Sequence, residues 1–163
     1  MLMLDLEFVR AQFPGLQTEW TLFDNAGGSV PLGRIIDRVQ DYMRTCMVQL
    51  GASYGLSAEA TRRVAMGHTA AEQLFGAGEG EVVIGSSSTA LTRLVAAALR
   101  PMWLPGDEVI VTDLDHEANI GAWRNLAATG VVVREWQCDA DTHALRIEDL
   151  EPLLNERTRL VAF

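Results

Sequence analysis

The sequence predicts an α/β fold with a three-layer, mainly parallel sheet, preceded by N-terminal helices. Beyond Gly80, short runs rich in β-branched residues alternate with segments whose apolar residues recur at helical spacing. The connections between these segments are short, which is typical of right-handed strand-helix-strand units that cover both faces of a sheet. A chain of 163 residues with 48% hydrophobic content can also bury one core.

Helices dominate the first half of the chain. Apolar residues at helical spacing predict two long helices, over 32–50 and 57–75, and a glycine follows each of them. Ser57, with a glutamate close behind it, resembles a capping signal. The other elements predicted here are a helix over 5–13, an extended piece over 21–23 and a glycine-rich turn over 24–29.

The second half of the chain supplies the predicted sheet. Its strands are expected over 81–84, 108–112, 131–136 and 159–163, and its helices over 89–100, 117–129 and 146–155. The last strand stops at the chain end with nothing after it to cover it. We therefore expect this sequence to be the first part of a longer polypeptide.

Composition narrows the range of functions. A formal net charge of -9 argues against a nucleic-acid partner, which would require clustered cations facing phosphates. Cys46 and Cys138 lie far apart without zinc-ligand spacing, so neither a metal site nor a disulfide framework is predicted. The sequence shows no signal peptide and no apolar run of membrane length, so we expect a cytoplasmic protein. All 13 cationic residues are arginine, and the chain contains no lysine.

A hydroxyl-rich turn at 85–89 joins the first predicted strand to a helix. Free N–H groups at a helix start, the positive end of the helix dipole and several hydroxyls together suit a phosphate dianion. The stretch matches neither the P-loop nor the Gly-x-Gly-x-x-Gly fingerprint. The alternative is that one serine is simply an N-cap and the others are solvated turn residues; the pattern alone does not decide between the two.

His116 follows the predicted strand 108–112 directly. Ligands of open α/β sheets bind beyond the carboxyl ends of the strands, so an imidazole here is placed to lie against a flat cofactor or to move protons. In the alternative interpretation it only hydrogen-bonds a neighbouring carboxylate, Asp113 or Asp115. His68 lies at core spacing on a helix and His143 in a polar turn, so neither is assigned a catalytic role.

Several motifs follow one another along nearly the whole chain. They are Phe23-Asp24-Asn25-Ala26, Ser88-Thr89-Ala90 with Leu94-Val95-Ala96, Pro105-Gly106-Asp107-Glu108-Val109-Ile110, Asp115-His116-Glu117-Ala118-Asn119-Ile120 with Trp123, and Arg157-Thr158-Arg159-Leu160-Val161-Ala162. In this order, the motifs resemble the amino-terminal half of the cysteine desulfurase and selenocysteine lyase group. This group belongs to the class V aminotransferase family of fold-type-I enzymes, which use pyridoxal 5′-phosphate (PLP).

The resemblance implies a role for each matching residue. The backbone N–H groups of Ser88 and Thr89 and the Thr89 hydroxyl would bind the cofactor phosphate. His116 would stack on the pyridine ring and assist proton transfer, which makes it the candidate catalytic residue. Asn25 and Ala26 would lie near a small amino-acid substrate.

The resemblance also implies an organisation. Residues 1–30 would form a segment that packs near the active site, and 31–163 the first part of the PLP-binding large domain. A homodimer is expected, and a sulfur-acceptor protein is a further expected partner.

The chain departs from the family pattern at three points. Ala90 stands where the family commonly has an acidic residue, and 51–55 replaces the Arg-Gly-x-His stretch of many desulfurases. The lysine that forms the Schiff base with PLP, the aspartate that pairs with its ring nitrogen and the mobile-loop cysteine lie, in the family, beyond Phe163. Because covalent attachment of PLP requires a lysine amine, we expect this chain to be inactive alone.

Other functions stay open at this stage. C–S or C–Se cleavage, β-lyase chemistry, epimerisation and transamination share this half of the fold, because the cofactor supplies the electron sink. A non-catalytic α/β module that binds a phosphorylated ligand or a protein partner is the main alternative. A Rossmann-type nucleotide domain is disfavoured by the missing glycine fingerprint.

Overall fold

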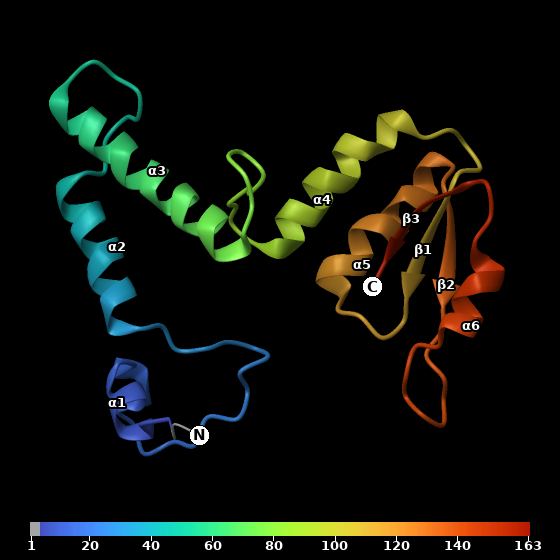
Figure 1. The fold of residues 1–163 in the computed structure, drawn as a ribbon, viewed down its shortest axis with the longest axis horizontal. Coiled ribbons are helices and arrows are strands. Elements are labelled where there is room, and N and C mark those ends of the chain that lie inside the picture. Colours follow the sequence, from blue (N-terminus) through green and yellow to red (C-terminus); the bar gives the residue numbers. More distant parts are fainter. Residues whose placement is uncertain (1–3) are drawn as a thin grey trace. The chain divides into compact units, whose positions relative to one another are not determined.

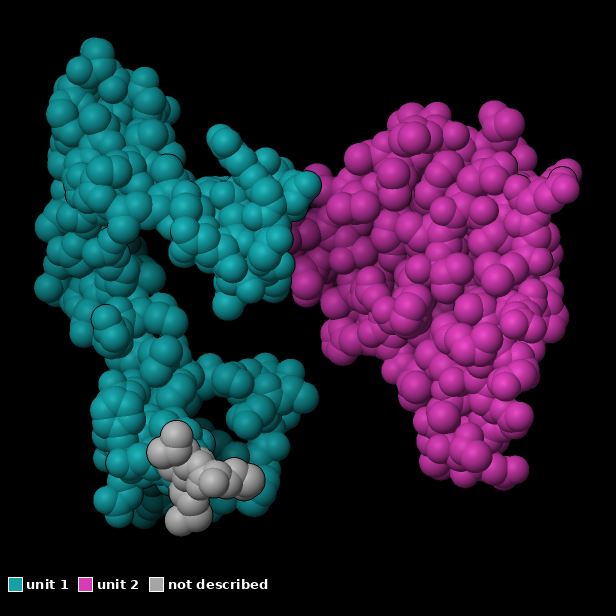
Figure 2. Space-filling model, in the orientation of Figure 1, with its two compact units in different colours: residues 1–83 teal, residues 84–163 magenta. Residues whose placement is uncertain are grey.

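A computed structural model of the chain describes residues 4–163. The chain divides into two compact units, residues 1–83 and 84–163, which are coloured separately in Figure 2. The first unit is helical, and the second contains a sheet flanked by helices (Figure 1). The mixed α/β class with a parallel sheet is therefore confirmed, although one predicted strand is absent and some predicted helices are shorter than expected.

Residues 4–83, the described part of the first unit, contain three α-helices. They are α1 (Leu6–Ala11), followed by a 3-10 turn at Pro14–Leu16, α2 (Gly33–Thr45) and α3 (Gly55–Phe75). The helix predicted over 32–50 ends early, at Thr45, and an irregular loop follows it. Residues 21–23, predicted to be extended, lie in no strand.

Ser57 does not cap α3, contrary to prediction. The helix begins two residues earlier, after Tyr54, without a side-chain cap. The Ser57 side chain is fully buried; its hydroxyl donates to the carbonyl of Gln49 at 2.6 Å and accepts from the N–H of Ala52 at 2.8 Å. A buried serine that bonds two backbone groups of the preceding loop stabilises that loop rather than the helix end.

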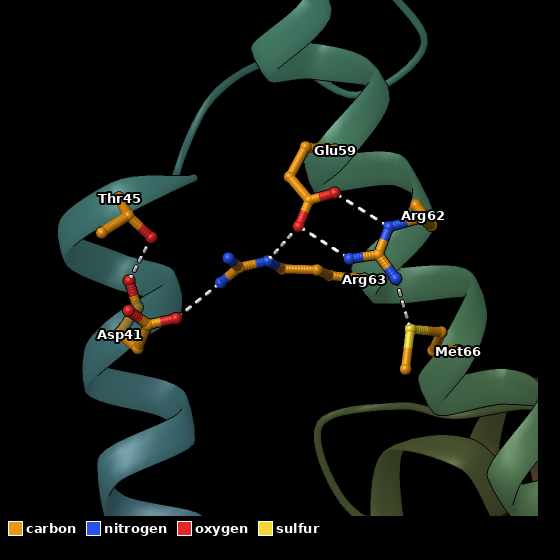
Figure 3. A network of polar contacts seen from close by, with 6 residues as sticks. All are labelled: Asp41, Thr45, Glu59, Arg62, Arg63 and Met66. Carbon is orange, nitrogen blue, oxygen red and sulfur yellow. Dashed lines mark hydrogen bonds and ion pairs between the residues drawn. The ribbon is translucent and has the colours of Figure 1, made fainter.

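An ion-pair network joins α2 to α3 (Figure 3). The Arg63 guanidinium contacts Asp41 on α2 at 2.6 Å and Glu59 on its own helix at 2.7 Å. Arg62 reaches the same Glu59 carboxylate at 2.8 Å. Hydrogen bonds from Arg62 and then Arg63 lower the pKa of Glu59 from its ordinary 4.5 to about 2. The Arg63–Asp41 pair thus links α2 to α3, two helices that bury few side chains in this unit.

The second unit is built on three parallel strands in the order β2-β1-β3. Its elements are α4 (Ser88–Leu99), a 3-10 turn (Arg100–Met102), β1 (Glu108–Thr112), α5 (Glu117–Arg124), a 3-10 turn (Asn125–Thr129), β2 (Val132–Trp136), α6 (Ile147–Leu150), a 3-10 turn (Glu151–Leu153) and β3 (Thr158–Ala162). The predicted helix over 146–155 is thus reduced to about two tight turns. Pro152 sits at the start of the second turn, where its missing N–H is tolerated.

The strand order explains the three layers. The chain moves from β1 to one neighbour through α5, then crosses back past β1 to the other neighbour through α6. Right-handed connections in opposite directions place their helices on opposite faces of the sheet. Figure 1 shows α5 and α6 on either side of the strands, in agreement with this rule.

The core of the second unit lies between the sheet and the helices α4 and α5. Every residue of β1 is buried, as expected for a central strand with both faces covered. Its fully covered apolar residues are Val109, Ile110 and Val111. The buried cluster consists of Ala96, Trp103, Val109, Val111, Ile120, Ala122, Trp123, Leu126, Val131 and Ala162.

The predicted strand over 81–84 is absent. Residues 81–85 have no regular structure, and Val83 and Ile84 are 71% and 53% exposed. A strand needs a hydrogen-bonded neighbour, and within residues 4–163 the sheet contains only β1, β2 and β3. The apolar pattern identified a segment suited to pairing, without supplying its partner.

Acidic side chains at the amino edge of the sheet are buried and paired. The Glu108 carboxylate accepts hydrogen bonds from Arg134 on β2 and, at 2.8 Å, from Asn155 before β3. These two donors, Arg134 first, lower the pKa of Glu108 from its ordinary 4.5 to about 2. Asp107 accepts from the N–H of Leu104 at 2.8 Å and pairs with Arg159 at 2.9 Å. These bonds connect all three strands where they begin.

Candidate functional site

The first turn of α4 leaves hydrogen-bond donors free. Ser87 is the N-cap: its hydroxyl oxygen accepts from the N–H of Ala90 at 3.1 Å, and its carbonyl accepts from Leu91 at 3.0 Å. Within residues 4–163, the N–H groups of Ser88 and Thr89 and the Thr89 hydroxyl have no hydrogen-bond partner. One serine does act as a cap, and the next two residues still present donors at the positive end of the helix.

Thr89 and His116 lie on the walls of one hollow. The hollow has a volume of about 250 Å³ and lies between α4 and α5; we call it the α4–α5 hollow. Its lining residues are Thr89, Arg93, His116, Glu117, Ala118, Gly121, Ala122 and Asn125. The end of α4 leads into the start of β1, so the first turn of α4 lies toward the opposite, carboxyl edge of the sheet. The first turn of α5 follows the end of β1 and lies at the same edge. This is the edge at which open α/β sheets bind ligands.

His116 has a structural bond in addition to its place in the hollow. It is the N-cap of α5, and its Nδ1 accepts from the N–H of Ala118 at 2.9 Å. An accepting Nδ1 carries no proton, so the neutral ring has its proton on Nε2. This bond orients the imidazole and leaves Nε2 as the ring nitrogen that is open to other partners.

Neither neighbouring aspartate binds the imidazole. Asp115 accepts from the backbone N–H of His116 at 2.6 Å and from the Asn119 side chain. Asp113 accepts from the backbone N–H of Cys138 at 2.7 Å, which ties the loop after β1 to the loop after β2. The alternative interpretation, in which the imidazole of His116 only hydrogen-bonds Asp113 or Asp115, is therefore wrong. The imidazole instead caps the first turn of α5, a role that the sequence did not reveal.

The sequence reasoning also missed residues that line the hollow. Arg93 lies one turn after Thr89 on α4, and Asn125 follows the end of α5. Glu117 pairs with Arg124 at 3.2 Å, so its charge is offset by a neighbour. The i, i+4 spacing of Thr89 and Arg93 was the available signal, because such residues share a helix face.

Asn25 and Ala26 belong to the first unit, whereas the α4–α5 hollow lies entirely in the second. They occupy an exposed turn in which the Asp24 carbonyl accepts from the N–H groups of Gly27 and Gly28, both at 3.2 Å. The Asp24 carboxylate reinforces the turn by accepting from Gly27 at 3.2 Å. Their role near a substrate stays a prediction.

Among residues 4–163, no three His, Cys, Asp or Glu side chains cluster closely enough to bind a metal ion. No helix in that range is long and apolar enough to cross a membrane.

The donors at the start of α4 fit the phosphate group that the resemblance implies. Two backbone N–H groups and a hydroxyl converge where the helix dipole is positive, and an arginine lines the same hollow. This set matches a dianion with several acceptor oxygens. Across the hollow, the oriented imidazole of His116 provides a flat surface.

Comparison with known proteins identifies the family. The family model described as Aminotransferase class-V matches residues 21–163. The chain belongs to this family.

Curated relatives agree with this assignment and are much longer than the chain. The aminotransferase-like protein FGM3 of Gibberella zeae is 40% identical over 96% of this chain and 40% of its own length. A cysteine desulfurase of Pectobacterium atrosepticum is 35% identical over 96% of this chain and 40% of its own length. The chain thus spans about two fifths of these relatives.

Solved structures share the fold. The apo cysteine desulfurase of Thermococcus onnurineus NA1 has a TM-score of 0.87 and 23% identity, covering 98% of this chain and 40% of that one. A C-DES mutant with glycine covalently linked to its PLP cofactor has a TM-score of 0.79 and 24% identity, covering 93% and 39%. The fold of this chain is therefore part of the fold-type-I architecture of PLP-dependent cysteine desulfurases.

Proposed function

We propose that the complete polypeptide is a PLP-dependent enzyme acting on a small amino acid, with cysteine desulfurase-like cleavage of a C–S or C–Se bond. The observation that carries this proposal is the α4–α5 hollow, which brings Thr89 and His116 together. Family membership supports it, because the relatives and structural neighbours include cysteine desulfurases.

Each residue of the site has a distinct task in this proposal. The N–H groups of Ser88 and Thr89 and the Thr89 hydroxyl bind the cofactor phosphate. His116 lies over the pyridine ring, and its Nε2 is the atom that exchanges protons with the reacting substrate. Bound PLP supplies an electron sink for the bond that breaks, while the protein selects which bond that is.

Other parts of the site lie outside the second unit. We propose that Asn25 and Ala26 approach the substrate from the N-terminal segment, 1–30. The small residues of this turn would let a ligand come close to the backbone. The large domain would begin at residue 31 and continue in the rest of the polypeptide.

The 163-residue chain is proposed to be inactive alone. It contains no lysine, so the amine that holds PLP covalently must come from elsewhere in the polypeptide. We further propose that the complete protein is a cytoplasmic homodimer and that a sulfur-acceptor protein receives its product. Ala90 and the stretch 51–55 differ from the desulfurase pattern, and these positions are where a change of substrate within the family would be sought.

Covalent trapping tests the proposal. The complete polypeptide, purified with PLP, should show the visible absorbance of bound cofactor, and borohydride should fix PLP to a lysine outside residues 1–163. Absence of the absorbance from PLP-saturated protein would overturn the enzyme assignment. Phosphate-ligand binding without any trapped lysine would favour a non-catalytic binding module instead.

Two threonines on α4 provide a matched pair for testing the phosphate site. Thr89 lines the hollow, whereas the Thr92 hydroxyl donates to the carbonyl of Ser88 at 2.9 Å. We expect Thr89→Val to weaken PLP binding by about tenfold, the worth of one hydrogen bond to a charged group, and Thr92→Val to change it little. Titration of the apo protein with PLP measures both. Equal affinities for the two variants would contradict the assignment of Thr89.

A further inference from the structure

Arg93 places a positive charge in the α4–α5 hollow. It lines the hollow together with Thr89 and His116, and it lies four residues after Thr89 on the same helix. Residues four apart occupy one face of an α-helix, one above the other. Arg93 is therefore part of the wall that presents the Thr89 hydroxyl.

The side chain of Arg93 can reach the first turn of α4. Side chains of α-helices lean toward the N-terminus, over the preceding turn. A long arginine side chain at this position extends toward the level of Thr89, where the N–H groups of Ser88 and Thr89 are unbonded within the part of the chain that the structure describes. A guanidinium extended in this direction would lie near the Thr89 hydroxyl and these backbone donors.

The charge of Arg93 is uncompensated by the residues around it. Within residues 4–163, Arg93 forms no ion pair, whereas Arg63, Arg124 and Arg134 each pair with a carboxylate. Glu117 is the one acidic residue that lines the hollow, and it pairs with Arg124.

The residue after Thr89 strengthens this point. The family commonly has an acidic residue there, which at i, i+3 spacing could pair with a cation at position 93. In this chain Ala90 occupies that position, so no carboxylate competes for the guanidinium from the first turn.

We propose that Arg93 is an additional phosphate-binding residue, which contacts the phosphate of PLP alongside Ser88 and Thr89. The inference rests on the proposed function, because it assigns a residue to the same site. A guanidinium presents planar paired donors that match two phosphate oxygens, and its contacts are stronger than those of a neutral donor. The phosphate would then be bound by the donors of the helix start together with a cation from the same face of α4.

Paired titrations with PLP and pyridoxal test this proposal in the complete apo protein. The two ligands share the ring and aldehyde, and only PLP carries the phosphate. We expect Arg93→Gln to weaken PLP binding by about tenfold or more while pyridoxal binding stays the same. Arg93→Lys should recover part of the loss, since it restores the charge without the planar fork.

A charge-matched control separates local contact from overall charge. Arg44, exposed on α2, lies outside the hollow and makes no ion pair within the described residues. Arg44→Gln should leave both affinities unchanged. The phosphorus NMR signal of bound PLP gives a readout independent of turnover, and it should shift in Arg93→Gln and not in Arg44→Gln.

The outcomes distinguish failure of this inference from failure of the proposed function. If wild-type protein binds no PLP, the proposed function fails. If wild-type protein binds PLP and Arg93→Gln binds it equally well, only the assignment of Arg93 is overturned. An equal loss of PLP and pyridoxal affinity would also overturn it, because Arg93 would then act on the ring or on the fold.

Discussion

The polar groups at the two edges of the sheet in the second unit differ in whether they have hydrogen-bond and ion-pair partners. At the amino edge, the buried carboxylates of Asp107 and Glu108 are bonded to donors from neighbouring elements. At the carboxyl edge, the N–H groups of Ser88 and Thr89 lack partners within residues 4–163, and Arg93 forms no ion pair there. Both edges belong to the same three strands. The difference therefore lies in the pairing of the polar groups and not in the arrangement of the strands.

This difference separates stability from ligand binding. Buried polar groups that are fully paired hold strands in register and leave nothing for a ligand. Unbonded donors at a helix start cost little while water reaches them, and they are available to an anion. We therefore expect substitutions at the amino edge to change stability and those in the α4–α5 hollow to change PLP affinity.

Glu108→Ala should produce the largest effect on stability. It removes the acceptor shared by Arg134 and Asn155, and breaking a buried pair leaves its partners without compensation. We expect the thermal midpoint to fall by on the order of 10 °C, with PLP affinity unchanged in the folded protein. Differential scanning calorimetry and PLP titration measure the two quantities. Loss of PLP affinity without loss of stability would contradict the assignment of a purely structural role to the amino edge.

The sequence predicts the elements of this sheet well where burial alone determines them. The β-branched run after Pro105-Gly106-Asp107 forms β1 with the predicted bounds, 108–112, because a central strand is apolar on both faces. The equally apolar run at 81–84 forms no strand in the described chain. Apolar patterning reports that a segment is suited to burial, whereas pairing depends on another segment that the pattern does not identify.

The candidate site was predicted in part for a similar reason. Thr89 and His116 stand at helix starts next to strand ends, positions that the strand-helix alternation reveals. The i, i+4 spacing from Thr89 places Arg93 on the same helix face, but an arginine on an exposed helix face usually points into solvent. Only the packing of α4 against α5 shows that this face borders a hollow.

The pH dependence of unfolding should report the amino edge separately. Because Glu108 has a pKa of about 2 in the folded protein and an ordinary value of 4.5, its stabilisation is complete above pH 4.5 and disappears as the pH falls toward 2. Glu108→Gln keeps an acceptor oxygen without titrating, so its urea midpoint should fall less steeply over this range. Parallel curves for the two proteins would show that Glu108 does not provide this pH dependence.

The contrast between the two edges of the sheet is expected to be incomplete at His116. Substitution of this residue should give the smallest of the predicted changes in stability. As N-cap of α5 it accepts from Ala118, so it contributes to stability as well as to the hollow. His116→Asn retains a capping acceptor, whereas His116→Ala removes it at a cost of about 1 kcal/mol. Urea unfolding of the apo proteins should therefore rank the asparagine variant above the alanine variant, while both lose the imidazole that lines the α4–α5 hollow. Equal urea midpoints for the two variants would mean that the cap does not stabilise the protein. The role of His116 would then be confined to the α4–α5 hollow.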